Sequence, residues 1–243
     1  MSYVLIVGAK SDIAKAIALE YAKNGYDLYL SARDVTELEE FANDIRIRTE
    51  KNVKLVELDI LDYDSHLNFY EQLEEKPFGV ISAVGYLGEQ NKAQTDFTEA
   101  KKIIDTNYTG VVSLFNIIAN DFEVRKSGFI VGISSVAGDR GRKSNYIYGS
   151  VKASLTAYLS GLRNRLYDAE VNVLTVKPGF VATQMTKDMD LPKKLTAQPE
   201  EVAKDIFEAQ KKGKNIVYTK WIWKWVMLII KMIPEWKFKG MSI

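Results

Sequence analysis

Cysteine is absent from the 243-residue sequence, and histidine occurs once, as His66. Without thiols or a second histidine, the chain has no disulfide framework, no cysteine or multi-histidine zinc site and no Cys–His nucleophile. It also lacks a Gly-x-Ser-x-Gly segment, which argues against Ser-His-Asp hydrolysis. We therefore expect no metal site, and we expect His66, near a predicted helix start, to be a surface residue.

Proline is scarce as well, with five residues, and no Pro/Gly/Ser linker, repeat or low-complexity stretch divides the chain. The composition, 47% hydrophobic and 27% charged, is typical of one globular domain. The N-terminus lacks the basic start and apolar run of a signal peptide, so we expect a cytoplasmic protein.

Neither charge sign is in excess, because 33 lysines and arginines face 32 acids, and a net charge of +1 gives no general reason to bind nucleic acid. The balance hides an asymmetry. Residues 1–210 carry 25 basic and 31 acidic groups, whereas residues 211–243 carry eight lysines, one acid (Glu235) and all four tryptophans. Such a difference in sign between segments indicates an interaction surface.

Short apolar runs alternate along the chain with segments of helical periodicity. This alternation predicts right-handed crossovers and a parallel sheet with helices on both faces. We predict an α/β fold, a Rossmann-type doubly wound parallel sheet in a single domain over residues 1–219, followed by an apolar, lysine- and tryptophan-rich C-terminal helix in 220–243. The predicted strands are 3–8, 27–32, 53–58, 78–84, 128–134, 171–176 and 215–218; the predicted helices are 11–24, 35–49, 63–75, 96–122, 145–167 and 199–212.

The first strand meets the first helix at a turn from Gly8 to Ala14, where backbone N–H groups and the helix dipole are placed to receive a pyrophosphate. The turn keeps one of the three glycines of the dinucleotide fingerprint, and an ordinary capped turn is the alternative. Asp12 is unusual here, because its carboxylate repels phosphate unless it turns away to cap the helix.

Tyr148 and Lys152 lie four residues apart on a predicted helix, so the phenol and the ammonium share one face. A nearby ammonium favours the phenolate, and it therefore lowers the pKa of a tyrosine from its usual value of about 10. Ser134 and Ser135 end the fifth predicted strand, at the edge where open α/β sheets bind ligands. Together these residues predict proton transfer at the carboxyl edge of the sheet.

In order and spacing, these and further motifs make the chain resemble the short-chain dehydrogenase/reductase family over essentially its whole length. The resemblance implies that Tyr148 is the general acid/base, that Lys152 lowers its pKa and holds the nicotinamide ribose, and that Ser135 orients the substrate oxygen. It also implies that Asn107 supports a proton relay. The motifs are the Gly8 turn, Asp59-Ile60, Gly85, Asn107, Ser135, Tyr148 with Lys152, and the run from Pro178 to Thr183.

The same resemblance implies an NAD(P) cofactor, with Asp59 and Ile60 at the adenine and Val181 and Thr183 at the nicotinamide amide or phosphate. The cofactor-binding residues it implies, or that lie in the turn and after the second strand, are Gly8, Lys10, Ser11, Asp12, Ile13, Arg33, Asp59, Ile60, Gly85, Tyr148, Lys152, Pro178, Gly179, Val181 and Thr183.

Cofactor choice depends on the tip of the second strand, where Arg33 offers a cation for a 2′-phosphate and no carboxylate is placed for a ribose 2′-hydroxyl. This favours NADPH, with Lys10 as a second cation from the neighbouring turn. A surface ion pair between Arg33 and Asp34 is the alternative.

Within the family, the Gly-Ala-Lys-Ser-Asp-Ile-Ala turn and the runs 104–110 and 134–146 resemble those of a narrower group, the reductase subunit of decaprenylphosphoryl-ribose 2′-epimerase. That group reduces a 2-keto sugar held on a polyprenyl phosphate. The resemblance implies a lipid-linked sugar substrate, a separate flavin oxidase as partner and a homo-oligomer. Other lipid-linked sugars of surface-polysaccharide pathways stay open as substrates.

The loop between Ser135 and Tyr148 brings three cations, Arg140, Arg142 and Lys143, to the rim of the expected active site. Guanidinium groups suit phosphate oxygens, so these residues are candidates to hold the phosphate of the substrate. A solvated basic loop is the alternative.

An apolar run from Trp221 to Ile233 is interrupted only by Lys224 and Lys231. It is too short for the roughly 30 Å core of a bilayer, but tryptophan with lysine is typical of a helix that lies in the membrane interface. We expect peripheral contact with the inner face of a membrane. A helix that packs over the active site or forms an oligomer interface is the alternative.

These observations predict an NADPH-dependent ketoreductase acting on a polyprenyl-phosphate-linked keto sugar, as the reductive half of a 2′-epimerisation in cell-surface polysaccharide synthesis. One alternative is a reductase of a soluble ketone or keto-acyl substrate. The other, from a different class, is a non-catalytic NADP-binding sensor.

Overall fold

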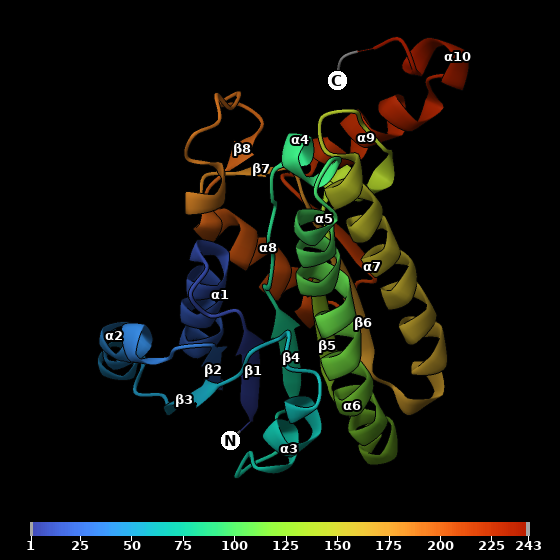
Figure 1. The fold of residues 1–243 in the computed structure, drawn as a ribbon. Helices are drawn as coiled ribbons and strands as arrows, with labels where there is room; N and C mark the ends of the chain where they lie inside the picture. Colours follow the sequence, from blue (N-terminus) through green and yellow to red (C-terminus); the bar gives the residue numbers. More distant parts are fainter. Residues whose placement is uncertain (1, 242–243) are drawn as a thin grey trace.

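A computed structural model describes residues 2–241 and contains one seven-stranded sheet, in which the neighbouring strands pair in parallel (Figure 1). The strand order, β3-β2-β1-β4-β5-β6-β9, reverses between β1 and β4, and a crevice forms at the carboxyl ends of strands on either side of such a reversal. This Rossmann-like sheet in a single domain confirms the predicted fold class. The strands are β1 (Tyr3–Val7), β2 (Asp27–Ala32), β3 (Val53–Glu57), β4 (Gly79–Ser82), β5 (Phe129–Ile133), β6 (Asn172–Pro178) and β9 (Ile216–Thr219).

Helices cover both faces of the sheet. Side chains alternate between the two faces along each strand, and because apolar side chains lie on both faces, both must be buried. In β1, Val4 and Ile6 belong to one buried cluster, whereas Leu5 and Val7 belong to the other. The first cluster includes α1 (Asp12–Lys23), α2 (Glu39–Thr49) and α8 (Pro199–Lys211); the second includes α3 (Ser65–Glu71), α6 (Gly110–Arg125) and α7 (Tyr146–Arg165).

Two predictions, for residues 96–122 and for His66, are wrong. Residues 96–122 are not one helix: α5 (Phe97–Ile104) and α6 are joined by a π-helical segment, Asp105–Thr109. His66 is fully buried rather than on the surface, because α3 packs against α6 and places its Nδ1 2.9 Å from the hydroxyl of Ser113.

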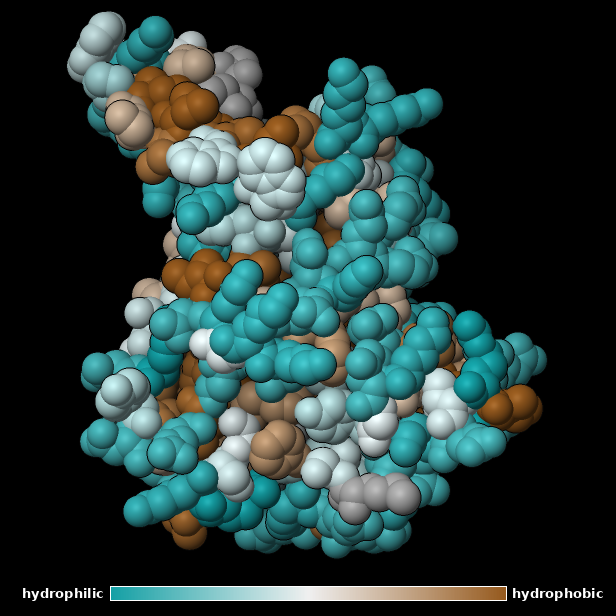
Figure 2. All heavy atoms as spheres, turned by 180° about the vertical axis from the view of Figure 1, so that it is seen from behind, coloured by the Kyte–Doolittle hydropathy of each residue, from teal (hydrophilic) through white to brown (hydrophobic). Residues whose placement is uncertain are grey.

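After β9, the chain forms α9 (Ile222–Met232) and α10 (Glu235–Phe238) at the end of the molecule where the strands have their carboxyl ends (Figure 1). One side of α9 buries Trp223 and Met227 against Val136 and Phe180. On the space-filling surface, apolar side chains gather over this corner of the molecule (Figure 2). Among the helices of residues 2–241, none is long and apolar enough to cross a membrane.

Candidate functional site

Two adjoining cavities of about 300 and 380 Å³ lie along the carboxyl edge of the sheet. They share the wall formed by Lys10, Ser11 and the segment after β4, residues 83–85. We call them together the groove. Its larger half is lined by Gly8, Arg33, Asp59 and Ile60, and its other half by Ser135, Tyr148, Lys152 and the segment from Pro178 to Thr183.

The turn after β1 fits a close approach of a phosphate group. Gly8 has φ +83°, and a Cβ there would lie 3.0 Å from the backbone nitrogen of Val84, so a side chain would strain the turn and crowd the groove wall. Ser11 caps α1, since its Oγ accepts a hydrogen bond of 3.2 Å from the N–H of Ala14. The first-turn N–H groups of α1 therefore face the groove at the positive end of the helix dipole, which suits a pyrophosphate.

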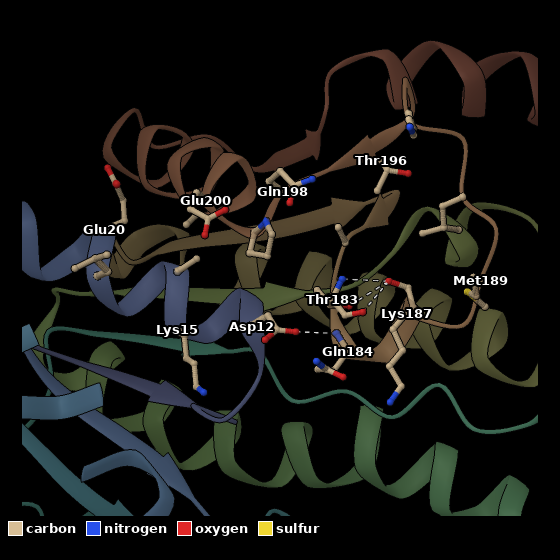
Figure 3. Close-up of a pocket in the computed structure, with 18 of the residues that line it drawn as sticks. Asp12, Lys15, Glu20, Thr183, Gln184, Lys187, Met189, Thr196, Gln198 and Glu200 are labelled. Carbon is tan, nitrogen blue, oxygen red and sulfur yellow. Dashed lines mark hydrogen bonds between the residues drawn. The ribbon is translucent and has the colours of Figure 1, made fainter. Parts of the chain in front are cut away.

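Asp12 lines the edge of the groove, and its carboxylate does not cap α1. Its carboxylate accepts a hydrogen bond of 2.8 Å from the backbone N–H of Gln184 (Figure 3). The carboxylate that was unexpected in a phosphate-binding turn is thus used to hold a segment 172 residues later in the chain. No local pattern in the sequence indicates this contact.

Tyr148 and Lys152 lie on the first two turns of α7, and both line the groove. The Nζ of Lys152 is 5.6 Å from the centre of the Tyr148 ring and donates a hydrogen bond of 3.0 Å to the carbonyl of Ile133. Burial raises the pKa of Tyr148 to about 12, although the Ser135 hydroxyl acts to lower it, and burial lowers the pKa of Lys152 to about 8. The prediction that Lys152 lowers the pKa of Tyr148 is therefore wrong for this structure: the pKa lies above its ordinary value because of burial, and the group that opposes the rise is Ser135.

The two serines that follow β5 have different surroundings. The hydroxyl of Ser134 lies 2.8 Å from both the carbonyl of Lys152 and the hydroxyl of Thr156, so it ties β5 to α7. Ser135 caps the short turn from Val136 to Asp139 and accepts a hydrogen bond from the N–H of Ala137. Ser135 is only partly buried, and its hydroxyl keeps the capacity to donate a hydrogen bond.

Asn107 does not line the groove; it lies fully buried in the π-helical segment behind it. Its amide donates to the carbonyls of Tyr86 (2.7 Å) and Ile103 (2.8 Å), and its Oδ1 accepts from the N–H of Tyr86 (3.2 Å). The side chain therefore fixes the chain after β4, the segment that forms the shared wall of the groove.

Arg33 is exposed at the rim of the larger half of the groove. Asp34, its suggested partner, instead accepts hydrogen bonds from the N–H and hydroxyl of Thr36, which lower the pKa of its carboxyl. Within residues 2–241, Arg33 forms no ion pair, whereas Lys10 lies 3.0 Å from Glu37. Arg33 is therefore the more available cation for an added phosphate.

The three cations of the loop after Ser135 lie in different places. Arg140 does not reach the groove, because it donates to the carbonyls of Ile230 (2.5 Å) and Ile233 (2.6 Å) and lies 2.9 Å from Glu235. Lys143 is exposed and does not line the groove either. Only Arg142 lines it, half-buried, with its Nε lacking a hydrogen-bond partner in the described chain.

Trp223 of α9 forms part of the support behind the groove, which the sequence did not indicate. A Cβ on Gly179 would lie 2.0 Å from its indole ring, so only glycine leaves room for this packing. The ring also packs edge-on against Phe180, and its Nε1 donates a hydrogen bond of 3.0 Å to the carbonyl of Leu195. The helix thus packs over the segment beside the expected active site, one of the alternatives considered for it.

A larger hollow of about 1180 Å³ lies on the other side of residues 182–198, between this segment, α1 and the start of α8 (Figure 3). Asp12, Lys15 and Lys187 are among its charged residues, together with Glu20 and Glu200. Ser135, Tyr148 and Lys152, which line the groove, do not line this hollow. In the part of the chain that the structure describes, no group of three or more acidic or histidine side chains is arranged to hold a metal ion.

A family model described as short chain dehydrogenase matches residues 2–194. An uncharacterized oxidoreductase of Mycobacterium tuberculosis is 34% identical over 241 residues, covering 98% of this chain and 96% of the relative. An NADP-dependent 3-hydroxy acid dehydrogenase of Schizosaccharomyces pombe is 27% identical over 229 residues, 88% of each chain. Among solved structures, a short-chain dehydrogenase from Sphingobium yanoikuyae in complex with NADPH has a TM-score of 0.85 over 97% of both chains at 23% identity, a likeness of fold.

Proposed function

This chain belongs to the short-chain dehydrogenase family, and we propose that it works as an NADPH-dependent ketoreductase. It is an NAD(P)-dependent oxidoreductase that acts on CH–OH or C=O groups. The observation that carries the proposal is the convergence of Ser135, Tyr148 and Lys152 on one half of a groove whose other half begins at the Gly8 turn.

NADPH supplies, when bound, the hydride that reduces a carbonyl carbon. Tyr148, with a pKa of about 12, is protonated at neutral pH and can therefore donate its proton to the alkoxide oxygen. The Ser135 hydroxyl holds that oxygen beside the phenol, and Lys152 holds the nicotinamide ribose. Asn107 acts indirectly, by fixing the segment after β4 against which the cofactor lies.

The turn from Gly8 to Ile13 would hold the pyrophosphate, with Asp59, Ile60 and Gly85 around the adenosine and Pro178, Gly179, Val181 and Thr183 around the nicotinamide. All of these residues except Ala9 line the groove. We propose NADPH over NADH because Arg33 stands free at the rim beside Lys10, and because a relative in fission yeast is described as NADP-dependent.

The decisive test of the chemistry is Tyr148→Phe. We expect NADPH-dependent turnover to fall by about 10³-fold, since one positioned proton donor is lost, while NADPH fluorescence shows unchanged cofactor binding. Tyr146→Phe is the matched control, because Tyr146 is exposed two residues earlier on the same helix and does not line the groove. Full turnover by Tyr148→Phe would contradict the assignment.

For the substrate, we propose a keto sugar linked to a polyprenyl phosphate, reduced as one half of a 2′-epimerisation in cell-surface polysaccharide synthesis. The support is Arg142, a half-buried guanidinium that lines the groove and whose Nη2 donates only to the sulfur of Met227, since guanidinium groups bind phosphate oxygens well. Arg140 is not part of this proposal, because its donors are already used by α9 and α10.

Arg142→Gln should raise the KM for a prenyl-phosphate keto sugar by about tenfold, the loss of one charge-assisted contact, and leave the KM for a small soluble ketone unchanged. Lys143→Gln is the control on the same loop. Efficient reduction of soluble or acyl ketones with no gain from the prenyl phosphate would favour the alternative, a reductase of soluble substrates.

An epimerisation also needs an enzyme that makes the keto sugar, so we propose a separate flavin oxidase as partner. A homo-oligomer remains a prediction as well, which light scattering of the purified chain measures. We place the protein in the cytoplasm, peripheral on the inner face of the membrane.

A further inference from the structure

We infer that the outward side of α9 and α10 is a docking surface for an anionic lipid bilayer. We call this side the C-terminal apolar face. Its side chains are each between 37% and 74% exposed, although all are large and apolar. It consists of Trp221, Ile222, Trp225, Leu228, Ile229, Met232 and Trp236.

The spacing of these residues makes the face continuous. At 3.6 residues per turn, Trp225, Ile229 and Met232 fall on one side of α9, opposite the buried pair Trp223 and Met227. One apolar side of α9 thus packs on the protein and the other is exposed. An exposed apolar patch of this kind is unfavourable in water and marks an interaction site. Figure 2 shows this apolar cluster on the surface at the C-terminal corner.

Charge next to the face selects a lipid surface with anionic headgroups. Lys224 and Lys231 are seven residues apart on one flank of α9, and Lys237 follows on α10. Within residues 2–241, none of the three is in an ion pair, and Glu235, the one acid of residues 211–241, lies 2.9 Å from Arg140. The face carries three exposed tryptophans, whose indole rings favour the depth of the lipid headgroups. Lysines beside it are then placed to contact anionic headgroups.

The length of α9 sets the orientation. Eleven residues extend about 16 Å, half of a bilayer core, so the helix lies along the surface and does not span it. Its opposite side contacts Val136 and Phe180, which line the groove. Docking by this face therefore brings the groove next to the lipid, where a polyprenyl-linked substrate stays, and in this respect the inference rests on the proposed function.

All four tryptophans of the chain lie in residues 221–236, so their fluorescence reports on this region directly. The full chain, without cofactor or substrate, is mixed with vesicles of phosphatidylcholine and phosphatidylglycerol. We expect it to float with these vesicles and its tryptophan emission to shift to shorter wavelength. The double variant Trp225→Ser/Ile229→Ser should partition at least about tenfold less.

The matched control is Ile47→Ser/Val124→Ser, which removes two apolar side chains, 81% and 83% exposed, from α2 and α6. It should bind vesicles as the wild type does. Lys224→Gln/Lys231→Gln should weaken binding to anionic vesicles about tenfold and leave the weak binding to pure phosphatidylcholine unchanged.

Absence of wild-type binding to anionic vesicles, or equal loss in the control, would overturn the inference. So would a wild-type dimer that Trp225→Ser/Ile229→Ser converts to a monomer without any vesicle binding, since the face would then serve a second copy. The Tyr148→Phe enzyme should bind vesicles normally. A failed activity assay therefore counts against the proposed function alone, and failed flotation counts against the docking surface alone.

Discussion

The two walls of the groove are constructed differently. One stands on β5 and α7 and carries Ser135, Tyr148 and Lys152; we call it the helix wall. The other, residues 178–198, contains only the two-residue strands β7 (Phe180–Val181) and β8 (Thr196–Ala197) and one short turn; we call it the loop wall.

The helix wall is held by its own backbone and by buried side chains such as Ser134. The loop wall has hydrogen bonds of its own, such as that from the N–H of Ala182 to the carbonyl of Ala197, and it is fastened to the rest of the molecule by Asp12, Trp223 and Lys220. Behind it lies the hollow of about 1180 Å³. Proton transfer, which needs fixed geometry, is thus placed on a helix and a strand, whereas the proposed contacts to the nicotinamide fall on a segment with little regular secondary structure.

Lys152→Met tests the helix wall most strongly. We expect turnover to fall by about 10³-fold while the free energy of unfolding at pH 7 rises by about 1–2 kcal/mol, because the buried ammonium is removed.

Burial lowers the pKa of Lys152 to about 8, so the unfolded state binds the proton more tightly. Wild-type stability should therefore rise between pH 8 and about 10.5, and that rise should vanish in the variant. Denaturant titrations at several pH values measure both, and a destabilised variant would argue for a structural role of the ammonium.

Trp223→Ala tests the support of the loop wall. Removing a buried indole should lower the free energy of unfolding by about 3 kcal/mol. The hydrogen bond to the carbonyl of Leu195 and the ring contact with Phe180 are lost, so we also expect lower turnover. Trp225→Ala, on the exposed side of the same helix, should change stability by less than about 0.5 kcal/mol. Urea unfolding and NADPH turnover compare the two, and equal effects would mean that the inner side of α9 does not support the groove.

Arg33→Ala tests the cofactor end of the groove, away from both walls. Loss of one charge-assisted contact should raise the KM for NADPH about tenfold and leave the KM for NADH unchanged. Arg48→Ala, an exposed arginine of α2 beside Asp44, is the control. A parallel change for both cofactors would remove Arg33 as the determinant of the preference.

The smallest effect is expected at His66, in the layer behind the groove. Burial lowers its pKa, so the folded state takes up a proton less readily than the unfolded state. Its contribution to stability is present above about pH 6.5 and is lost as the pH falls below that value. His66→Gln should unfold with a flatter dependence on pH between 7.5 and 5.5, as measured by urea titration. An unchanged slope would place the pH dependence elsewhere.

Much of the helix wall could be read from the sequence, because strand runs, the four-residue spacing of Tyr148 and Lys152 and the end of β5 are local patterns. The loop wall could not. Asp12 finds its partner 172 residues away, and Arg140 binds carbonyls of residues 230 and 233, contacts that no spacing encodes. The π-helical break at Asn107 was missed for a different reason, since hydrophobic periodicity continues through a segment whose hydrogen-bond register changes.

The contacts of Arg140 also affect the order in which the site is completed during synthesis. The loop between Ser135 and Tyr148 is fastened by the carbonyls of Ile230 and Ile233, about ninety residues later. The cofactor end of the groove, made from residues before 110, can therefore form while the chain is still being translated from its N-terminus. The substrate end waits for α9, so the nascent protein acquires a place for the adenosine end of the cofactor well before it acquires a closed place for the substrate.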